Sequence, residues 1–220
     1  LHGYAKVTER LTMERQDLGA SPASQLACKA ALEAAGITAS DLTCIDLYSC
    51  FPIAVFNICD GLGLSPQDPR GLTVTGGLPY FGGPGNSYST HAIASMVEKL
   101  RANPDRFGFI GANSGFLSKY AVGIYSTRPV EFRHCDSRAL QARVDAWPAP
   151  GLEHEADGEA TVETYTIVYD KAGPSYGVVA GRLDATGERF LANTHDGDAE
   201  TLQAMIDADP LGRRIHVRSF

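Results

Sequence analysis

The chain lacks most features that would place it outside the class of ordinary globular proteins. It has no run of about 18 apolar residues, the length that suggests a membrane span. Lys and Arg number 19 against 26 Asp and Glu, and the net charge of −7 without any basic run argues against a nucleic-acid-binding surface. No Cys-x-x-Cys spacing or other ligand pattern indicates a metal. We therefore expect neither a membrane span, nor a nucleic-acid partner, nor a metal or tightly bound cofactor.

The cysteines and the first residues suggest where the protein resides. The five cysteines are Cys28, Cys44, Cys50, Cys59 and Cys135. Their odd number and their place in helical or strand patterns are typical of reduced, mostly buried thiols, which favours a cytoplasmic protein. The start has no charged leader followed by an apolar run, so it does not read as a signal peptide. It reads instead as the middle of a strand, and we expect the chain to be a piece of a longer protein.

Residues 1–129 alternate strand and helix patterns. Strands are predicted over 1–8, 44–48, 106–110 and 120–126, and helices over 21–36, 52–62 and 87–103. Residues 111–115 are predicted to form a loop. This alternation favours an α/β half-domain with a mixed, largely buried sheet.

Residues 130–220 follow a different pattern. Short strands are predicted at 160–169, 175–183, 189–193 and 214–218, with turn signals between them and one helix at 199–208. This order favours a small antiparallel OB-like β-barrel, and we place the domain boundary between residues 129 and 130. The aromatic residues of this region have few basic neighbours, which is a poor basis for nucleic-acid binding. Packing or docking is the better interpretation.

The segment Thr73–Tyr88 is the most informative part of the chain. Five glycines and two prolines fall within ten of its residues, 76–85. Such a density favours a backbone that passes close to a ligand, although packing between helix and loop is the alternative. The predicted substrate-binding residues are Gly76, Gly77, Gly82, Gly83, Pro84 and Asn86, together with Cys50.

Three segments in order resemble the C-terminal half of a thiolase domain, in the sterol-carrier-protein-type, or lipid-transfer, branch. Asp46–Phe51 is similar to the Asn-Glu-Ala-Phe segment, which that branch writes His-Asp-Cys-Phe. Gly76–Pro84 is similar to the loop that reads Gly-Gly, four residues, then Gly-His-Pro. Gly111–Gly115 is similar to the segment that holds the second catalytic cysteine or its His-Asn-Leu-Gly variant. The region from residue 130 resembles the additional C-terminal β-barrel of bacterial thiolase-like proteins.

The resemblance implies a coenzyme A thioester as substrate or ligand, and a missing N-terminal half that carries the nucleophilic cysteine. It also implies that the catalytic residues of ordinary thiolases are missing from this chain. The activating histidine would stand at Gly83, the second cysteine at about Ala112, and the Asn-Glu pair at Tyr48-Ser49. Because general acid–base steps commonly supply factors of about 10²–10⁴ each, we do not expect ordinary thiolase catalysis.

Three side chains are candidates for catalysis. Tyr48 and Tyr80 could act as acids or oxyanion donors, and Asn113 could donate to a thioester oxygen. For each there is a structural alternative, since buried tyrosines usually pack with satisfied hydroxyls and an asparagine between glycines suits a turn. Cys50 lacks a neighbouring base, so we interpret it as a small apolar residue of the binding site rather than a nucleophile.

These observations predict an acyl-CoA-binding, thiolase-like member of the acyltransferase superfamily, active in lipid or acyl-CoA metabolism. Two alternatives stay open. One is a non-catalytic scaffold that binds a protein partner, with the barrel as a contact surface. The other is a thiolase-fold retro-aldolase that acts on a hydroxyacyl-CoA. The sequence leaves undecided whether the chain is an enzyme.

Overall fold

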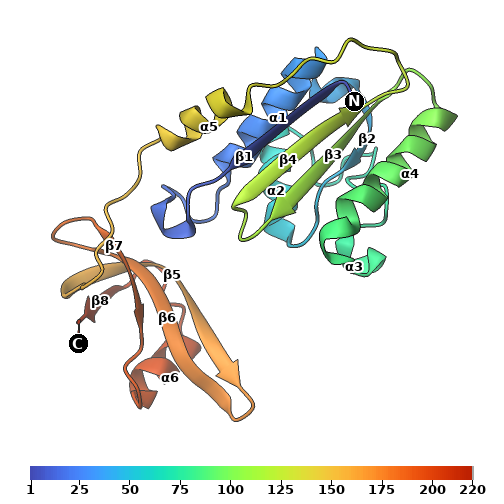
Figure 1. The fold of residues 1–220 in the computed structure, drawn as a ribbon. Helices are drawn as coiled ribbons and strands as arrows, with labels where there is room; N and C mark the ends of the chain where they lie inside the picture. Colours follow the sequence, from blue (N-terminus) through green and yellow to red (C-terminus); the bar gives the residue numbers. More distant parts are fainter. Residues whose placement is uncertain (220) are drawn as a thin grey trace. The chain divides into compact units, whose positions relative to one another are not determined.

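The computed structural model describes residues 1–219, which form two compact units (Figure 1). The first unit comprises Leu1–Thr12 and Asp17–Trp147. The second comprises Met13–Gln16 and the residues from Pro148 onward. Each unit has its own sheet and its own core, so each is described by itself.

The first unit contains a four-stranded mixed sheet in the order β1-β4-β3-β2. Its strands are β1 (Gly3–Thr8), β2 (Leu42–Asp46), β3 (Phe107–Ser114) and β4 (Lys119–Tyr125). β2 is parallel to β3, whereas β4 is antiparallel to both β3 and β1. The predicted mixed α/β sheet is therefore confirmed.

The loop predicted at residues 111–115 is wrong for most of its length, because β3 continues to Ser114. Gly111 pairs with Val122, and Asn113 pairs with Tyr120 in β4. Gly111 reads as a loop residue but leaves room for the side chain of Tyr120, whose hydroxyl would lie 2.2 Å from a Cβ at that position. The glycine thus permits close packing within the sheet rather than a turn.

Proline and glycine bound the two helices that follow β1 and β2. α1 (Pro22–Ala35) and α2 (Pro52–Leu62) each carry a proline in the first turn and end at a left-handed glycine, Gly36 (φ 69°) and Gly63 (φ 67°). α4 (Tyr88–Ala102) precedes β3, and a short α3 (Leu78–Phe81) lies within the glycine-rich segment. Single 3₁₀ turns occur at Thr12–Glu14, Ala39–Asp41 and Gly85–Ser87.

Helices cover both faces of this sheet, but unequally. α1 packs along β1 and β4 and contacts α2, and the buried Ala5, Phe109 and Ile124 belong to this layer (Figure 1). α4 packs on β3 and β2, where Met96 and Ile110 are buried. Since side chains alternate along a strand, the two clusters lie on opposite faces. On the face where α4 packs, no helix of the described residues covers β1 and β4.

The compact units divide at Trp147/Pro148 and not at the 129/130 boundary that the sequence suggested. The reason is α5 (Ser137–Asp145), a helix that we did not predict. Its buried Leu140 and Val144 are four residues apart, lie on one face, and join the core formed with α1 and β1. Residues up to Trp147 thus belong to the α/β unit.

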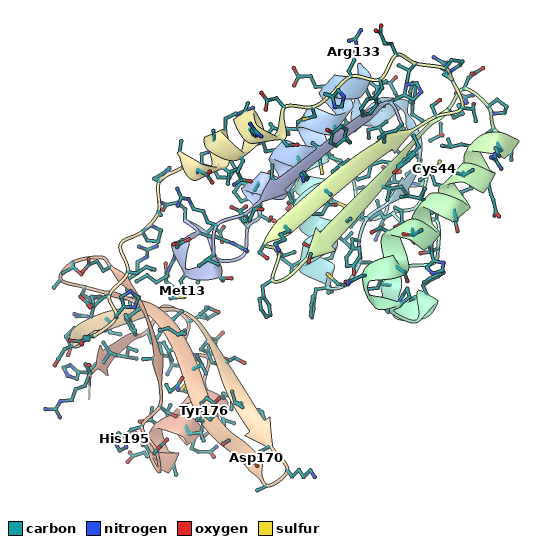
Figure 2. The ribbon with its side chains drawn as sticks, in the orientation of Figure 1. Met13, Cys44, Arg133, Asp170, Tyr176 and His195 are labelled. Atoms are coloured by element: carbon teal, nitrogen blue, oxygen red, sulfur yellow. The ribbon has the colours of Figure 1, made fainter. Side chains whose placement is uncertain are left out.

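The second unit is a curled antiparallel sheet in the order β7-β6-β5-β8, which confirms the predicted barrel-type domain. Its elements are β5 (Gly158–Asp170), β6 (Gly173–Leu183), β7 (Arg189–Asn193), α6 (Ala199–Asp207) and β8 (Arg214–Val217). Met205 of α6 packs against Val162 and Val179 on the inner face. Asp170 and Tyr176 lie near the tip of the long β5–β6 hairpin (Figure 2).

The thiols are all free, and Cys28 and Cys59 are buried while the other three are half-buried. Burial raises the pKa of the Cys59 thiol, so this group favours the neutral form. In residues 1–219, no helix combines the length and hydropathy that crossing a membrane would require.

Candidate functional site

The motif segments meet at the carboxyl ends of strands β2 and β3 of the first sheet. β2 and β3 run parallel, so the segment after Asp46 and the end of β3 lie at the same edge. There the Asn113 side-chain amide donates a hydrogen bond to Cys50 Sγ, with 3.3 Å between nitrogen and sulfur. Asn113 is 8% exposed, and it supports Cys50, the member of the pair that lines the candidate site.

A cavity of about 310 Å³ opens beside this pair. Its walls come from the segment after β2, the first turn of α2 and the glycine-rich loop, and they are largely apolar. The lining residues are Ser49, Cys50, Phe51, Pro52, Val55, Leu72, Thr73, Gly76, Gly77, Pro79 and Tyr80. The structure thus brings together Cys50, Gly76, Gly77 and Tyr80.

Gly76 and Gly77 make the sharp turn that forms one wall. Their φ angles of 96° and 90° lie in a region that favours glycine. A Cβ on Gly77 would also lie 3.2 Å from Ser49 Oγ. That hydroxyl accepts the Leu78 backbone N–H at 2.8 Å and so joins the loop to the first motif. Ser49 thus holds the loop in place.

A buried carboxylate fixes the start of the same loop. Asp46 is fully buried at the end of β2 and accepts hydrogen bonds from the Val74 N–H at 2.9 Å, the Thr73 hydroxyl at 3.0 Å and the Tyr88 hydroxyl at 3.0 Å. Burial raises the pKa of Asp46, and these hydrogen bonds oppose the shift. Sequence reasoning missed the role of Asp46, although a carboxylate at the end of an apolar strand was the available signal.

Several predicted residues lie outside this cavity. Gly82, Gly83, Pro84 and Asn86 do not line it, and they join α3 to α4. Gly83 has a φ of 56° and no atom within 4 Å of an added Cβ, so its surroundings are open. That these residues bind substrate therefore stays a prediction, which requires a ligand that extends beyond this cavity.

The candidate tyrosines differ in their surroundings. Tyr48 is half-buried and packs edge-on against Tyr88, with ring centroids 5.3 Å apart, away from the cavity lining. Tyr80 lines the cavity and is 90% exposed. Of the two, only Tyr80 stands where its hydroxyl could meet a ligand in the cavity.

Two buried polar groups near the site have no hydrogen-bond partner within residues 1–219. They are the Asn113 side-chain oxygen and the hydroxyl of Tyr120, the cross-strand neighbour of Asn113. Burial raises the pKa of Tyr120 well above its usual value. Because buried polar groups normally have partners, Asn113 has capacity for a further donor.

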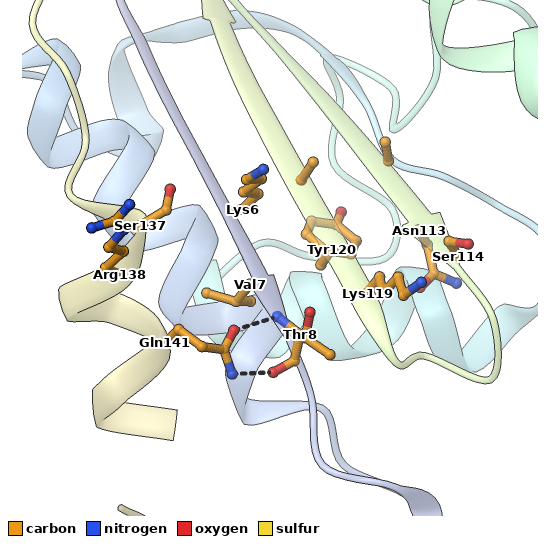
Figure 3. Close-up of a pocket in the computed structure, with 12 residues that line it drawn as sticks. Lys6, Val7, Thr8, Asn113, Ser114, Lys119, Tyr120, Ser137, Arg138 and Gln141 are labelled. Atoms are coloured by element: carbon orange, nitrogen blue, oxygen red, sulfur yellow. Dashed lines mark hydrogen bonds between the residues drawn. The ribbon is translucent and has the colours of Figure 1, made fainter. Parts of the chain in front are cut away.

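A second, larger cavity of about 520 Å³ lies across the part of the sheet that α4 leaves open (Figure 3). Lys6, Ala112, Lys119 and Ala121 come from β1, β3 and β4, and Arg138 comes from α5. Figure 3 shows the two hydrogen bonds that join Gln141 of α5 to the backbone of Thr8, at 2.8 and 3.0 Å. No acidic residue of the described chain lines this groove, so its cations face no carboxylate there.

The comparisons with known proteins agree with the geometry. The family model of the thiolase-like protein type 1 additional C-terminal domain matches residues 139–219. The crystal structure of a monomeric SCP2-thiolase-like protein type 1 from Mycobacterium smegmatis matches with a TM-score of 0.93 and 49% identity. The chain belongs to the thiolase-like branch. The match covers 100% of this thiolase-like chain and 48% of the relative, so the chain spans about half of that protein's length.

A comparison with curated proteins gave no match. The resemblance that rested on three short segments is thus confirmed for a thiolase-like chain with an additional C-terminal domain. Among the residues that the structure describes, no group of three or more His, Cys, Asp or Glu side chains could hold a metal ion.

Proposed function

We propose that the chain contributes an acyl-CoA-binding cavity to a thiolase-like protein of lipid or acyl-CoA metabolism that lacks ordinary thiolase catalysis. One observation carries the proposal. The first motif, with Cys50, and the glycine-rich loop line a single cavity of about 310 Å³, and Asn113 is hydrogen-bonded to Cys50. Coenzyme A enters as part of the substrate or ligand and not as a resident cofactor.

The side chains of the site suit a thioester. Phe51, Val55 and Leu72 provide apolar walls for an acyl chain. Asn113 is not part of the lining of this cavity, but its side-chain N–H donates to the Cys50 sulfur and so positions the thiol at the cavity wall.

The same lining offers no general base. Among the described residues around the cavity there is no His, Asp or Glu, and Cys50 has an amide beside it rather than an imidazole. Claisen chemistry needs a thiolate and a group that moves the α-proton of the substrate. Binding without ordinary thiolase turnover is therefore the function that this site supports best.

The test is calorimetric titration of the complete protein with hexanoyl-CoA, with free coenzyme A as the reference. Tyr80→Ala removes an aromatic wall that is 90% exposed, so it should raise Kd by about tenfold without unfolding the protein. Tyr169→Ala removes an exposed tyrosine of the second unit and should leave Kd unchanged. No binding by any of these forms would refute the proposal.

A retro-aldolase is the second candidate, and Tyr80 is the observation that favours it. Its hydroxyl lies on the cavity wall, where it could protonate or hold an oxyanion during carbon–carbon cleavage. The titration with hexanoyl-CoA does not separate binding from this activity. Release of an aldehyde or ketone from a hydroxyacyl-CoA, lost in Tyr80→Phe, would establish the enzyme.

The scaffold alternative rests on surfaces rather than on the cavity. A missing N-terminal half is the partner we propose for the open face of β1 and β4, since such sheets are commonly covered on both faces. Exposed Tyr176 and Leu191 in the second unit offer a surface for a separate protein partner.

A further inference from the structure

The second unit includes four residues from far upstream in the chain, Met13–Gln16. They follow β1, overlap the 3₁₀ turn Thr12–Glu14 and precede α1. The matched domain model covers residues 139–219 and therefore does not contain them. One side chain of β7, Arg189, donates hydrogen bonds to three of these four residues.

Arg189 is fully buried, with a side-chain exposure of 0%. It lies on the edge strand β7, and its Nε donates to Glu163 of β5. Its two Nη groups donate to Glu163 again and to the backbone carbonyls of Met13 at 2.7 Å, Arg15, and Gln16 at 3.3 Å. A guanidinium has five N–H donors, and these five acceptors satisfy all of them.

The carboxylate alone could not satisfy this arginine. Glu163 also accepts a hydrogen bond from Arg182 at 2.6 Å, so two guanidinium groups share one carboxylate. Three of the five acceptors of Arg189 are carbonyls of the upstream segment. If the segment left, three N–H donors of a buried cation would lose their partners, which is a costly state in a protein interior.

The middle of the segment is buried, while Met13 and Glu14 are half-buried and Gln16 is exposed. Arg15, in its middle, is 4% exposed although arginine is normally a surface residue. The backbone carbonyl of the buried Arg15 thus meets the buried side chain of Arg189. Met13, labelled in Figure 2, marks the first carbonyl of this arrangement.

We propose that Met13–Gln16 is an obligatory bound element of the additional C-terminal domain, recognised through its three carbonyls by the buried guanidinium of Arg189. The domain is therefore not self-contained. It carries a site for a short turn with three convergent carbonyls, and the partner that fills the site is a segment of the same chain. Folding of the second unit and immobilisation of residues 13–16 become one event.

Limited trypsin digestion of the full chain tests this, with cleavage after Arg15 as the readout by mass spectrometry. Arg189→Met removes the recognising group and should speed this cleavage by at least about tenfold, the factor that 1.4 kcal/mol of lost protection gives. Arg182→Met is the matched control, because it also removes a cation from Glu163 but touches no carbonyl of the segment. It should leave the cleavage rate after Arg15 unchanged. Equal rates in the two variants would overturn the proposal.

A second measurement uses the wild-type chain, so it can be made even if Arg189→Met does not fold. Trypsin digestion across a urea series gives a midpoint for each cleavage site. Cleavage after Arg15 should share the midpoint of sites in the second unit, such as Arg182 and Arg213, and not that of Lys29 or Arg70 in the first. Cleavage after Arg15 without urea, or together with the first unit, would overturn the proposal. If both units unfold at the same urea concentration, the comparison of Arg189→Met with Arg182→Met tests the proposal instead.

Discussion

Asn113 and Ala112 are neighbours in β3, yet their side chains lie on opposite faces of the sheet because side chains alternate along a strand. The thiolase resemblance placed the second catalytic cysteine at about Ala112. In this structure both residues line the open groove, and only Asn113 also contacts Cys50. The residue that contacts Cys50 of the candidate site is therefore an amide, which holds hydrogen bonds but does not transfer protons at neutral pH.

A pH prediction concerns Asp68, which pairs with Arg70 at 2.7 Å. Hydrogen bonds from the Arg70 side chain and backbone lower the pKa of Asp68 from 3.8 to about 2. The depressed value means that the stabilisation is complete above pH 3.8 and is lost as the pH falls toward about 2. Arg70 also donates to the carbonyls of Ala39 and Leu42, so the pair anchors the start of β2.

The measurement is urea unfolding of the first unit between pH 5 and pH 2. Asp68→Asn should make the unfolding free energy less dependent on pH in the acid range than in the wild type. Glu98→Gln, an exposed change on α4, is the control and should keep the wild-type slope. A wild-type slope in Asp68→Asn would contradict the assignment of the pair.

Part of the site could be predicted from local sequence and part could not. The glycine pair and Cys50 were recognisable because their types and spacing are local signals. The roles of Asp46 and Ser49 depend on which loop folds back over β2, and no local pattern contains that information. The same limit applies to Tyr48, whose ring packs against Tyr88 from α4, forty residues later.

At the scale of elements, α5 carries the difference between the predicted and the observed boundary. Its apolar residues are few, with Leu140 and Val144 as the two that are buried. A helix of nine residues with such a short stripe gives a weak periodic signal, so the sequence did not reveal it. By contrast α1, α2 and α4 carry longer stripes and terminating glycines or prolines, and their predicted bounds agree with the structure within about two residues.

Truncation of α5 should therefore destabilise the α/β unit. Leu140→Ala removes a side chain that is 7% exposed and packs in the core with α1 and β1, and it should cost about 2–4 kcal/mol. Arg143→Ala changes the exposed face of the same helix and should cost under about 0.5 kcal/mol. Chemical unfolding of both variants gives the two values. If Leu140→Ala cost no more than Arg143→Ala, α5 would not belong to the core of this unit.

The whole molecule raises the question of what lies over the open face of the first sheet. The chain spans about half the length of its thiolase-like relative, with 48% of that protein covered. The groove over β1, β3 and β4 contains the small side chains of Ala112 and Ala121 as well as Lys6 and Lys119. Small residues allow close approach of another layer, and two lysines without a carboxylate in the groove favour an acidic surface opposite them.

We therefore expect Ala121→Trp to act differently in the chain alone and in the complete protein. Ala121 is exposed and pairs with Lys6 in β1 and Ala112 in β3, so a large ring there stands at the centre of the groove. In the chain alone the ring meets solvent and the Tm should stay within about 2 °C, as for most surface changes. In the complete protein it would be forced into a packed layer, at a cost of about 1–3 kcal/mol, and the Tm should fall by several degrees. Ala142→Trp, on the exposed side of α5, is the matched control and should be neutral in both. An equal effect of Ala121→Trp in the two proteins would show that no second layer covers this face.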